Sequence, residues 1–373
     1  MSVKIVTVEN RRQLRKFLTF PFELYKDSEN WVPPLMGDEY DTFNPKQNGA
    51  YEFCDACLYL AYRDDKIVGR VAAIINFKAN ELWKQPVVRF GWLDFIEDQE
   101  VLNALLDSVV AWGKQHGCSE LKGPLGFTDM DKEGSLVEGY DRLSPFTCLY
   151  NYPYYDTLLK AYGLEKDVDW IQRVVHMDHV SPQVFKIAGL VEKRYGLHMA
   201  NAKTSRELCN KYGMSIFHMY NEAFAPLFQF TPLTDRQIKK YLATYVPIMD
   251  PDFLAVCLDA DDNPVGFAFG VPTLSEAVKK SNGRLFPFGF IRILRALKHN
   301  DTCEALLIGV LPEFQGKGAA LLIFNYLYEH ATKRGVTKVI MNPQLEENHK
   351  VQSMFDSFDP EFYMRRRSYV KKL

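Results

Sequence analysis

A short glycine-rich turn is the part of this sequence best suited to bind a ligand. It reads Gln-Gly-Lys-Gly-Ala-Ala, from Gln315 to Ala320, and contains one lysine and no acidic residue. An apolar, β-branched run precedes the turn and an apolar run with helical spacing follows it, which predicts a strand, the turn and then a helix. The start of a helix presents unpaired N–H groups and the positive end of the helix dipole, and glycines let the backbone approach an anion closely. The turn is therefore predicted to bind a diphosphate.

Two other phosphate-binding patterns do not fit this turn. The sequence has no GxxxxGK run followed by Ser or Thr, which a Walker A loop requires, and no GxGxxG after the first strand of a βαβ unit. A glycine turn that serves only helix–strand packing remains open as the alternative. The order of the surrounding elements favours the diphosphate.

Those elements occur twice in the chain. Residues 91–117 and 309–335 are both 27 residues long and align without a gap. Each predicts a strand, a turn and an amphipathic helix that ends at a glycine. Each also follows a predicted hairpin with an Asp-rich turn, at 58–76 and 253–272. The predicted order is β-α-α-β-β-β-α-β-α, twice, with the boundary between the copies at 181–200.

The two copies differ at the turn itself. The first has Glu-Asp-Gln-Glu at 97–100, where the second has Gln-Gly-Lys-Gly at 315–318, so that Asp98 aligns with Gly316. Acidic side chains would repel a diphosphate, so only the second copy is expected to bind one in this way. The second copy also carries an insertion of about 21 residues between its hairpin and its next strand, by comparison of the repeat periods.

At these residues the second copy resembles the GNAT superfamily, the Gcn5-related N-acetyltransferases. The family signature is Gln/Arg-x-x-Gly-x-Gly/Ala between a strand and a helix, which residues 315–320 match. A second family motif, Asn-x-x-Ala-x-x-x-Tyr, is met in part: Asn348 fits, Val351 replaces the Ala and Phe355 replaces the Tyr. The whole chain resembles a bacterial group of tandem GNAT proteins.

The resemblance implies an α+β fold with two tandem GNAT-like domains, each a mixed, mainly antiparallel sheet flanked by helices. Residues 1–180 are expected to form a degenerate domain that lacks the loop for the CoA pyrophosphate. Residues 195–373 are expected to form a GNAT domain with the acyl-CoA site and an insertion at about 273–300.

The resemblance also implies acetyl-CoA or a longer acyl-CoA as co-substrate, and no metal. In GNAT proteins the pantetheine arm of CoA runs beside the strand that precedes the loop, here near residues 308–311. The residues implied for binding CoA are Val310, Leu311, Gln315, Gly316, Lys317, Gly318, Ala319, Ala320 and Asn348.

Acyl transfer to an amine needs a base for the amine proton, stabilisation of the oxyanion and departure of the thiolate. Glu304 is the candidate base, because it lies eleven positions before Gln315 on the predicted strand, where several GNAT enzymes place a glutamate. A solvent-exposed glutamate at the strand end is the alternative. Phe355 stands where many relatives carry the tyrosine acid, so Tyr369 is predicted to replace it, with Tyr363 or water as alternatives.

The final strand is predicted to present several charged or polar residues on one face, by the two-residue period of a strand. That face either contacts substrate or a CoA phosphate, or lies in solvent on an edge strand. The residues are Arg365, Arg367, Tyr369 and Lys371.

The insertion is basic and amphipathic. Residues 277–300 contain six Lys or Arg and no acid, and a helical stripe is formed by Phe290, Ile293, Leu294 and Leu297. Two interpretations remain open. Residues 284–298 contact a membrane surface, which suits a long acyl chain or a lipid-like amine, or the helix packs its stripe against the neighbouring half.

A glycine-rich loop of the first copy is acidic. Such a loop either attracts a cationic amine or is a solvated turn. Its acids are Asp129, Asp131, Glu133, Glu138 and Asp141.

Composition limits the remaining possibilities. The 373 residues suffice for two domains, and the formal charge of −2 argues against nucleic acid as a partner. The sequence has no apolar run of the ~20 residues needed to cross a bilayer and no signal-peptide core, and its seven scattered cysteines fit a reducing compartment. The protein is expected in the cytoplasm, either free or peripheral at the inner membrane surface.

These patterns predict an acyl-CoA-dependent N-acyltransferase that moves an acyl group from CoA to an amine. The amine is either a small molecule or lipid-like; the second option resembles GNAT-type enzymes proposed for bacterial sphingolipid N-acylation. A non-catalytic acyl-CoA-binding or regulatory protein is the first alternative. An aminoacyl-tRNA-dependent transferase is the second, which the intact loop and the net charge disfavour.

Overall fold

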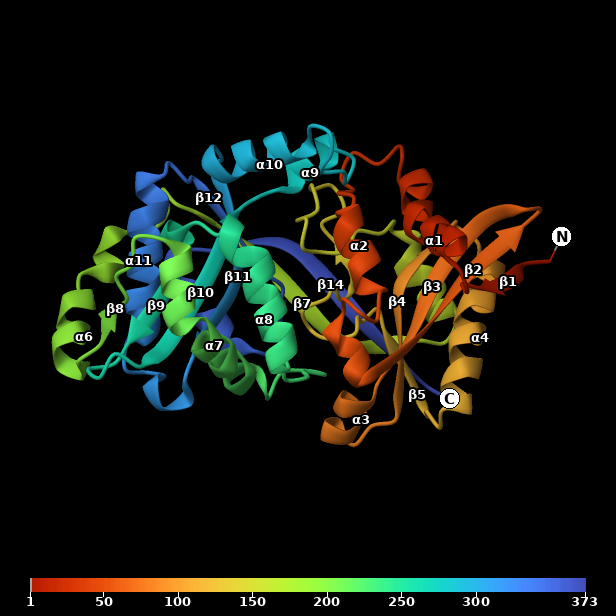
Figure 1. Cartoon of the computed structure of the whole chain (residues 1–373), viewed down its shortest axis with the longest axis horizontal. Helices are drawn as coiled ribbons and strands as arrows, with labels where there is room; N and C mark the ends of the chain where they lie inside the picture. The colour runs from red at the N-terminus through yellow and green to blue at the C-terminus, as the bar shows by residue number, and fades with distance from the viewer. Residues whose placement is uncertain (1) are drawn as a thin grey trace. The chain divides into compact units, whose positions relative to one another are not determined.

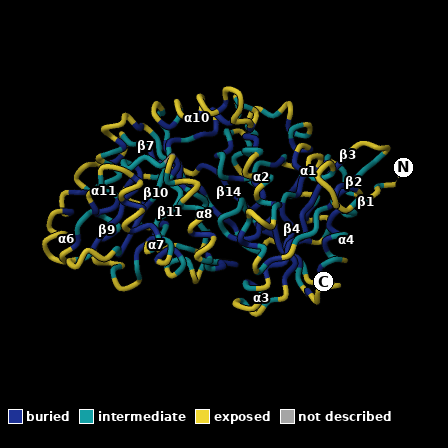
Figure 2. Tube along the Cα trace, in the orientation of Figure 1, coloured by how far each residue is buried: buried dark blue, intermediate teal, exposed yellow. Residues whose placement is uncertain are grey.

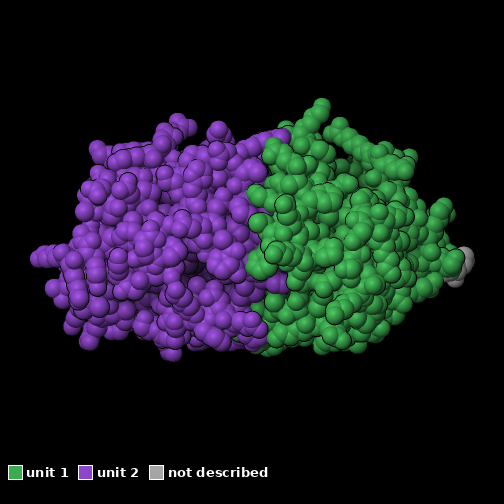
Figure 3. All heavy atoms as spheres, turned by 90° about the horizontal axis from the view of Figure 1, so that it is seen from below, with its two compact units in different colours: residues 1–171, 275–292, 364–373 green, residues 172–274, 293–363 purple. Residues whose placement is uncertain are grey.

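The structure is a computed structural model that describes residues 2–373. The chain divides into two compact units (Figures 1 and 3). Unit 1 comprises Met1–Ile171, Ser275–Arg292 and Met364–Leu373, and unit 2 comprises Gln172–Leu274 and Ile293–Tyr363. The units differ from the two sequence repeats, because part of the insertion and the end of the last strand belong to unit 1. The repeat boundary at 181–200 stays a prediction.

Unit 1 contains the predicted order of elements, with one extra helix and three extra strands. They are β1 (Lys4–Thr7), α1 (Arg11–Leu24), α2 (Met36–Thr42), β2 (Cys54–Arg63), β3 (Lys66–Asn76), α3 (Phe77–Trp83), β4 (Val87–Phe95), α4 (Gln99–Gln115), β5 (Glu120–Gly123), β6 (Ser135–Glu138), α5 (Tyr154–Ala161), the first part of β7 (Glu165–His176) and most of β14 (Glu361–Lys372). The strand order is β1-β2-β3-β4-β5-β14. Only the β4–β5 pairing in this row is parallel.

Unit 2 repeats the pattern around its own sheet. Its elements are the last part of β7, α6 (Ala188–Tyr195), β8 (His198–Met199), α7 (Ser205–Phe224), α8 (Asp235–Tyr245), β9 (Leu254–Leu258), β10 (Pro264–Pro272), β11 (Thr302–Val310), α11 (Ala319–Lys333), β12 (Lys338–Met341), β13 (Gln344–Leu345) and α12 (His349–Ser353). The strand order is β7-β12-β11-β10-β9-β8, with β11–β12 parallel and the other pairs antiparallel. The predicted α+β class with mixed, mainly antiparallel sheets is confirmed.

The insertion consists of two helices between β10 and β11. They are α9 (Ser275–Lys280) and α10 (Gly289–Lys298). In unit 1 the corresponding connection contains only α3. The segment 275–292 packs in unit 1, where the backbone N–H of Met36 donates to the carbonyl of Gly283 at 3.1 Å. Among the described residues, no helix combines the length and apolar composition needed to cross a membrane.

The repeat is also visible in how each helix meets its sheet. A Cβ added to Gly69 on β3 would lie 2.8 Å from Leu105 of α4, and one added to Gly266 on β10 would lie 3.0 Å from Ile323 of α11. Leu105 and Ile323 are equivalent positions of the ungapped alignment. In both copies a glycine therefore lets the helix pack closely on the strand that crosses under it.

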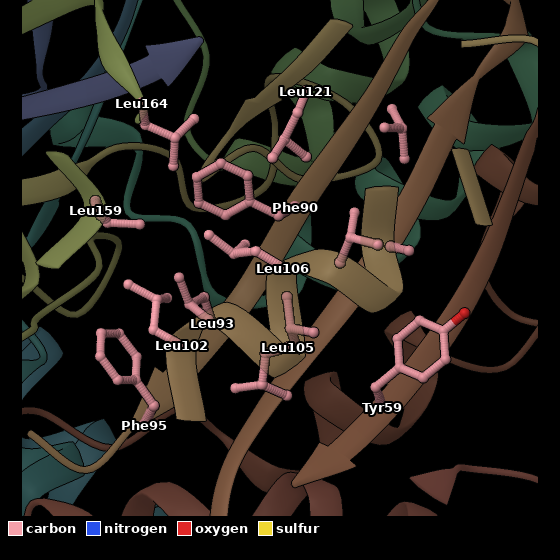
Figure 4. Packing of buried hydrophobic residues seen from close by; sticks show 14 of the residues in the cluster. Tyr59, Phe90, Leu93, Phe95, Leu102, Leu105, Leu106, Leu121, Leu159 and Leu164 are labelled. Atoms are coloured by element: carbon pink, nitrogen blue, oxygen red, sulfur yellow. The ribbon is translucent and has the colours of Figure 1, made fainter. Parts of the chain in front are cut away.

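The core of unit 1 lies between its sheet and α4. Figure 4 shows Leu102, Leu105 and Leu106 of α4 beside Phe90 and Leu93 of β4, and all five are buried in one cluster. Apolar residues spaced three and four apart place one face of a helix against a core. In unit 2 the equivalent contact is made by Leu322 and Ile323 of α11 on β10.

The charged face of β14 does not lie on a solvated edge strand, and its contact with substrate stays a prediction. β14 is not an edge strand, since it pairs with β5 and also with β6. Within unit 1, Arg367 binds the buried Asp169 through two nitrogens, at 2.8 and 2.9 Å, and Arg365 binds it at 3.2 Å. The Nζ of Lys371 donates to the carbonyl of Tyr162 at 2.7 Å. These side chains hold unit 1 together.

We expect Asp169→Asn to destabilise unit 1 by about 3–5 kcal/mol, the usual cost of leaving partly buried arginines without their carboxylate. Burial alone would raise the pKa of Asp169, but hydrogen bonds from Arg367 and Lys166 outweigh it and hold the pKa below its ordinary value. The contribution of Asp169 is therefore complete above the unfolded pKa of about 3.9 and is lost as the pH falls through the lower folded value.

Urea unfolding followed by tryptophan fluorescence measures this effect, because all five tryptophans lie within residues 1–171. The control is Asp141→Asn at an exposed position of the same unit, which should change the free energy of unfolding by less than about 0.5 kcal/mol. Equal effects of the two variants would show that the Asp169 pairs do not stabilise unit 1.

Candidate active site

The glycine-rich turn adopts the strand–turn–helix form that the sequence predicted. β11 ends at Val310, a 3₁₀ turn spans Pro312–Phe314, and α11 begins at Ala319. Gly316 and Gly318 have positive φ angles of 77° and 87°, which glycine adopts without steric cost. Gly318 is the N-cap of α11 and provides no side-chain hydrogen bond to the first turn. The N–H groups of that turn are therefore available to an anion.

The equivalent helix start in unit 1 is capped by an acid. There α4 begins at Gln99, and the carboxylate of Asp98 accepts hydrogen bonds from the N–H groups of Glu100 and Val101, at 2.9 and 3.2 Å. Arg63 pairs with Asp98 at 2.7 Å, and this hydrogen bond lowers the pKa of Asp98. A carboxylate of the chain itself thus occupies the helix start of the first copy.

The two glycines of the turn have different surroundings. A Cβ added to Gly318 would lie 2.5 Å from Val191 of α6, so close packing accounts for that glycine. A Cβ added to Gly316 would meet nothing within 4 Å. Packing, the alternative left open by the sequence, therefore explains Gly318 but not Gly316.

The rest of the turn is held by its own side chains. Gln315 donates from Nε2 to the carbonyl of Val310 at 3.1 Å, and Lys350 donates to its Oε1. Lys317 lies over the ring of Phe314. These contacts tie the turn back to β11, and they place two lysines close to the start of α11.

β11 is open along one edge just before the turn. It pairs with β12 only from Thr302 to Ala305, while it pairs with β10 as far as Val310. Opposite the step from Phe269 to Gly270, Leu306 is an extra residue on β11. From Leu306 to Val310 no strand pairing is described on the β12 side, so this edge can form hydrogen bonds with the amides of an extended ligand.

Glu304 lies on the same strand and is buried, with 2% of its surface exposed. The predicted alternative of a solvated glutamate is therefore wrong. The hydroxyl of Thr273 donates to the Glu304 carboxylate at 2.5 Å, and Asn300 donates to the carbonyl of Thr273 at 2.7 Å. Sequence reasoning missed Thr273. It follows the second hairpin strand directly, and extending the antiparallel pairing by one residue would have placed it opposite Thr302, on the same face of the sheet as Glu304.

The other predicted residues make contacts of their own. Asn348 is the N-cap of α12 and accepts a hydrogen bond from the N–H of Val351 at 3.3 Å. Phe355 is buried in an aromatic cluster, with its ring centroid 5.0 Å from that of Phe324. These contacts account for both residues within unit 2.

Tyr369 is fully buried in the core of unit 1, and its hydroxyl donates to Asp156 at 2.7 Å. Burial, together with this hydrogen bond, raises the pKa of Tyr369 far above its ordinary value. Its described contacts give Tyr369 a structural role in unit 1, and its role as the acid stays a prediction.

The acidic residues in the loop of the first copy differ in their burial. Glu138 and Asp141 are exposed, whereas burial raises the pKa of Asp131 to about 6 and that of Glu133 well above its ordinary range. The N–H of Thr128 donates to Asp131 at 3.0 Å. In the part of the chain that the structure describes, no group of three or more His, Cys, Asp or Glu is arranged to hold a metal ion.

One family model matches part of the chain, and two curated proteins match almost all of it. The family model described as "Acetyltransferase (GNAT) family" matches residues 214–359. Protein YghO from Escherichia coli (strain K12) is 28% identical over 98% of this chain and 95% of its own length. A protein named "Bacterial ceramide synthase" from Caulobacter vibrioides (strain NA1000 / CB15N) is 23% identical over 100% of this chain and 98% of its own.

Solved structures with a similar fold include two GNAT-type or acyltransferase-like proteins. A tandem GNAT protein from the clavulanic acid biosynthesis pathway matches with a TM-score of 0.57 at 12% identity, over 100% of this chain and 98% of its own. A probable N-acyltransferase from Enterococcus faecalis V583 matches with a TM-score of 0.54 at 8% identity, over 100% of this chain and 73% of its own. The repeated architecture, the turn of the second copy and these comparisons agree: residues 214–359 match the GNAT acetyltransferase family, and the chain as a whole has a fold similar to that of tandem GNAT proteins.

Proposed function

We propose that the protein is an acyl-CoA-dependent N-acyltransferase that moves an acyl group from CoA to an amine. One observation carries the proposal: the start of α11 is free of acids and side-chain caps, whereas Asp98 caps the equivalent helix in the first copy. A helix start kept open in one copy and filled in the other is what a single diphosphate site requires.

Each part of the site has a task in this reaction. The N–H groups at the start of α11 bind the CoA diphosphate, assisted by Lys317. The open edge of β11, from Leu306 to Val310, pairs with the amides of the pantetheine arm. Acyl-CoA supplies the activated acyl group, and Glu304 accepts the proton that the amine loses, either directly or through a water molecule.

A lipid-like amine and a long acyl chain are the substrates we favour. The relative named bacterial ceramide synthase matches the chain over its whole length, and a ceramide is the amide of a long-chain amine. Partly exposed apolar side chains, Leu306 and Leu307 among them, line the open stretch of β11. Such residues are suited to contact an apolar ligand.

A non-catalytic acyl-CoA-binding protein is the second candidate. It is favoured by Phe355, which fills an aromatic cluster where many GNAT proteins carry the tyrosine acid. It predicts tight binding of acyl-CoA with no release of CoA on addition of any amine. Water can protonate a departing thiolate, so the phenylalanine does not exclude turnover.

Calorimetric titration with acetyl-, octanoyl- and lauroyl-CoA tests this proposal. We expect affinity to rise at least tenfold from acetyl to lauroyl, because each buried methylene contributes about 0.8 kcal/mol. A long-chain 2-amino-1,3-diol should then release the CoA thiol faster than a short soluble amine does. Equal affinities for the three thioesters would refute a long acyl chain as the substrate but would leave the acyltransferase proposal standing. Absence of binding by all three thioesters would refute the acyltransferase.

A further inference from the structure

The loop between α9 and α10, together with α10 itself, exposes an unusual number of large apolar side chains. Phe286 and Phe288 are 78% and 67% exposed, and Ile291 and Leu294 are about half exposed. Leu285 and Phe290 are exposed as well. Figure 2 shows this part of the chain largely in the colour of exposed residues. Six such side chains within ten residues form a patch rather than the scattered exposure that is normal for a protein surface.

The apolar arc of α10 is wider than its packing uses. At about 100° per residue, the apolar side chains span about 160° of the helix. Ile293 and Leu297 occupy one side of that arc and are buried, whereas Phe290, Ile291 and Leu294 occupy the other side and are exposed. Packing, the second interpretation left open by the sequence, therefore accounts for only half of the stripe.

The charges around the patch have one sign. From residue 277 to residue 300 the chain carries six Lys or Arg and no acid. Arg284, Arg295 and Lys298 are exposed, and the described residues offer no carboxylate partner to any of them. On α10, the helical spacing places Lys298 in line with the exposed apolar residues and Arg295 at their outer edge. An apolar strip bordered by unpaired cations is complementary to an anionic lipid surface.

Hydrogen bonds hold the segment that carries the patch in place. Lys279 donates to the carbonyl of Glu29, the N–H of Met36 donates to the carbonyl of Gly283, and Arg292 donates to the carbonyl of Lys280. The patch is therefore an ordered surface of the folded protein.

We propose that residues 284–298 dock the protein on the surface of an anionic lipid bilayer, with Phe286 and Phe288 inserted among the lipids. The docking needs no acyl-CoA, so it stands or falls independently of the proposed acyl transfer. It would bring the enzyme to the source of a lipid-like amine.

Flotation of the full-length protein with vesicles, in the absence of acyl-CoA, tests this inference. We expect binding to phosphatidylcholine vesicles that contain phosphatidylglycerol, little binding to phosphatidylcholine alone, and release by high salt. Phe286→Ser with Phe288→Ser should lower the partition at least tenfold, as should Arg295→Gln with Lys298→Gln. The matched control is Phe77→Ser with Leu82→Ser on α3, whose side chains are 49% and 55% exposed in unit 1.

Three outcomes would overturn the proposal. The first is failure of the wild-type protein to bind anionic vesicles. The second is an equal loss of binding in the α3 control, which would indicate a general loss of apolar surface. The third is a dimer that light scattering shows to dissociate in the Phe286 and Phe288 variant while vesicles have no effect, because the patch would then be a contact between two copies of the chain.

Discussion

Replacing Gly316 by Asp is expected to lower the affinity for acyl-CoA by more than a hundredfold, whereas replacing it by Asn should lower it only a few-fold. Asp and Asn have the same shape, and both tolerate the positive φ of 77° better than other side chains do. A side chain at this position meets no neighbour within 4 Å of its Cβ. The two variants therefore differ in charge and share the backbone cost.

The charge acts in two ways. A carboxylate about 5 Å from one negative charge of the diphosphate costs about 3 kcal/mol at an effective dielectric constant of about 20, which is more than a hundredfold in affinity. The same carboxylate also offsets the positive end of the α11 dipole, because it lies two residues before the N-cap Gly318. Gly316→Asp thus gives the second copy the residue that the first copy has at this position.

Calorimetric titration with one acyl-CoA measures the effect, and thermal unfolding shows whether both variants remain folded. Added salt should narrow the difference between Asp and Asn, because exposed charges are screened over about 10 Å at 0.1 M salt. If Asp and Asn reduce the affinity for acyl-CoA equally, the start of α11 is not an anion site. Both the proposed diphosphate site and the proposed acyltransferase function would then be wrong.

Features that depend on neighbouring residues could be predicted from the sequence. The strand–turn–helix at Gln315, the two copies and the position of the insertion are local patterns of apolar spacing and glycine. The difference between Asp98 and Gly316 could also be predicted, because a helix start and an acid within it are adjacent in sequence. The structure adds that the acid caps the helix directly.

Features that depend on distant partners could not be predicted. The period of β14 placed Arg365, Arg367 and Tyr369 on one face, but the partners of that face lie about two hundred residues earlier in the chain, at Asp169 and Asp156. A strand pattern cannot distinguish such partners from solvent.

The buried side of α10 and the hydrogen-bond partner of Glu304 could not be predicted for the same reason. An apolar stripe on α10 has the same spacing whether all or half of it is covered, so the buried and exposed sides could be separated only by the structure. Thr273 is adjacent to Glu304 only across the β10–β11 pair. The spacing from Gln315 therefore predicted the glutamate and its strand, but not its hydrogen-bond partner.

Glu304→Gln is expected to lower kcat by about 10²–10⁴-fold, the usual contribution of a general base, with little change in the affinity for acyl-CoA. Gln preserves the volume of the buried side chain, and its carbonyl oxygen can accept the hydrogen bond that Thr273 now donates to Glu304. Its amide cannot take a proton from the amine. The variant therefore removes the proton acceptor and keeps the hydrogen bond.

The pH dependence separates this role from a structural one. In the variant the amine must lose its proton without help, so we expect the rate to keep rising with pH where the wild-type rate has reached its plateau. Thr273→Val, which removes only the hydrogen-bond donor, should lower kcat by a smaller factor and leave the plateau in place. Glu313→Gln removes the same charge from an exposed position before the turn and should leave kcat and KM unchanged.

The candidate functions give different results in this experiment. A transferase with Glu304 as its base or water-relay residue loses turnover in Glu304→Gln while it still binds acyl-CoA. A non-catalytic acyl-CoA-binding protein shows no amine-dependent thiol release in either form. A variant that retains full activity with an unchanged pH profile would assign proton removal to another group. The buried contact between Glu304 and Thr273 would then serve only to join β11 to the end of β10.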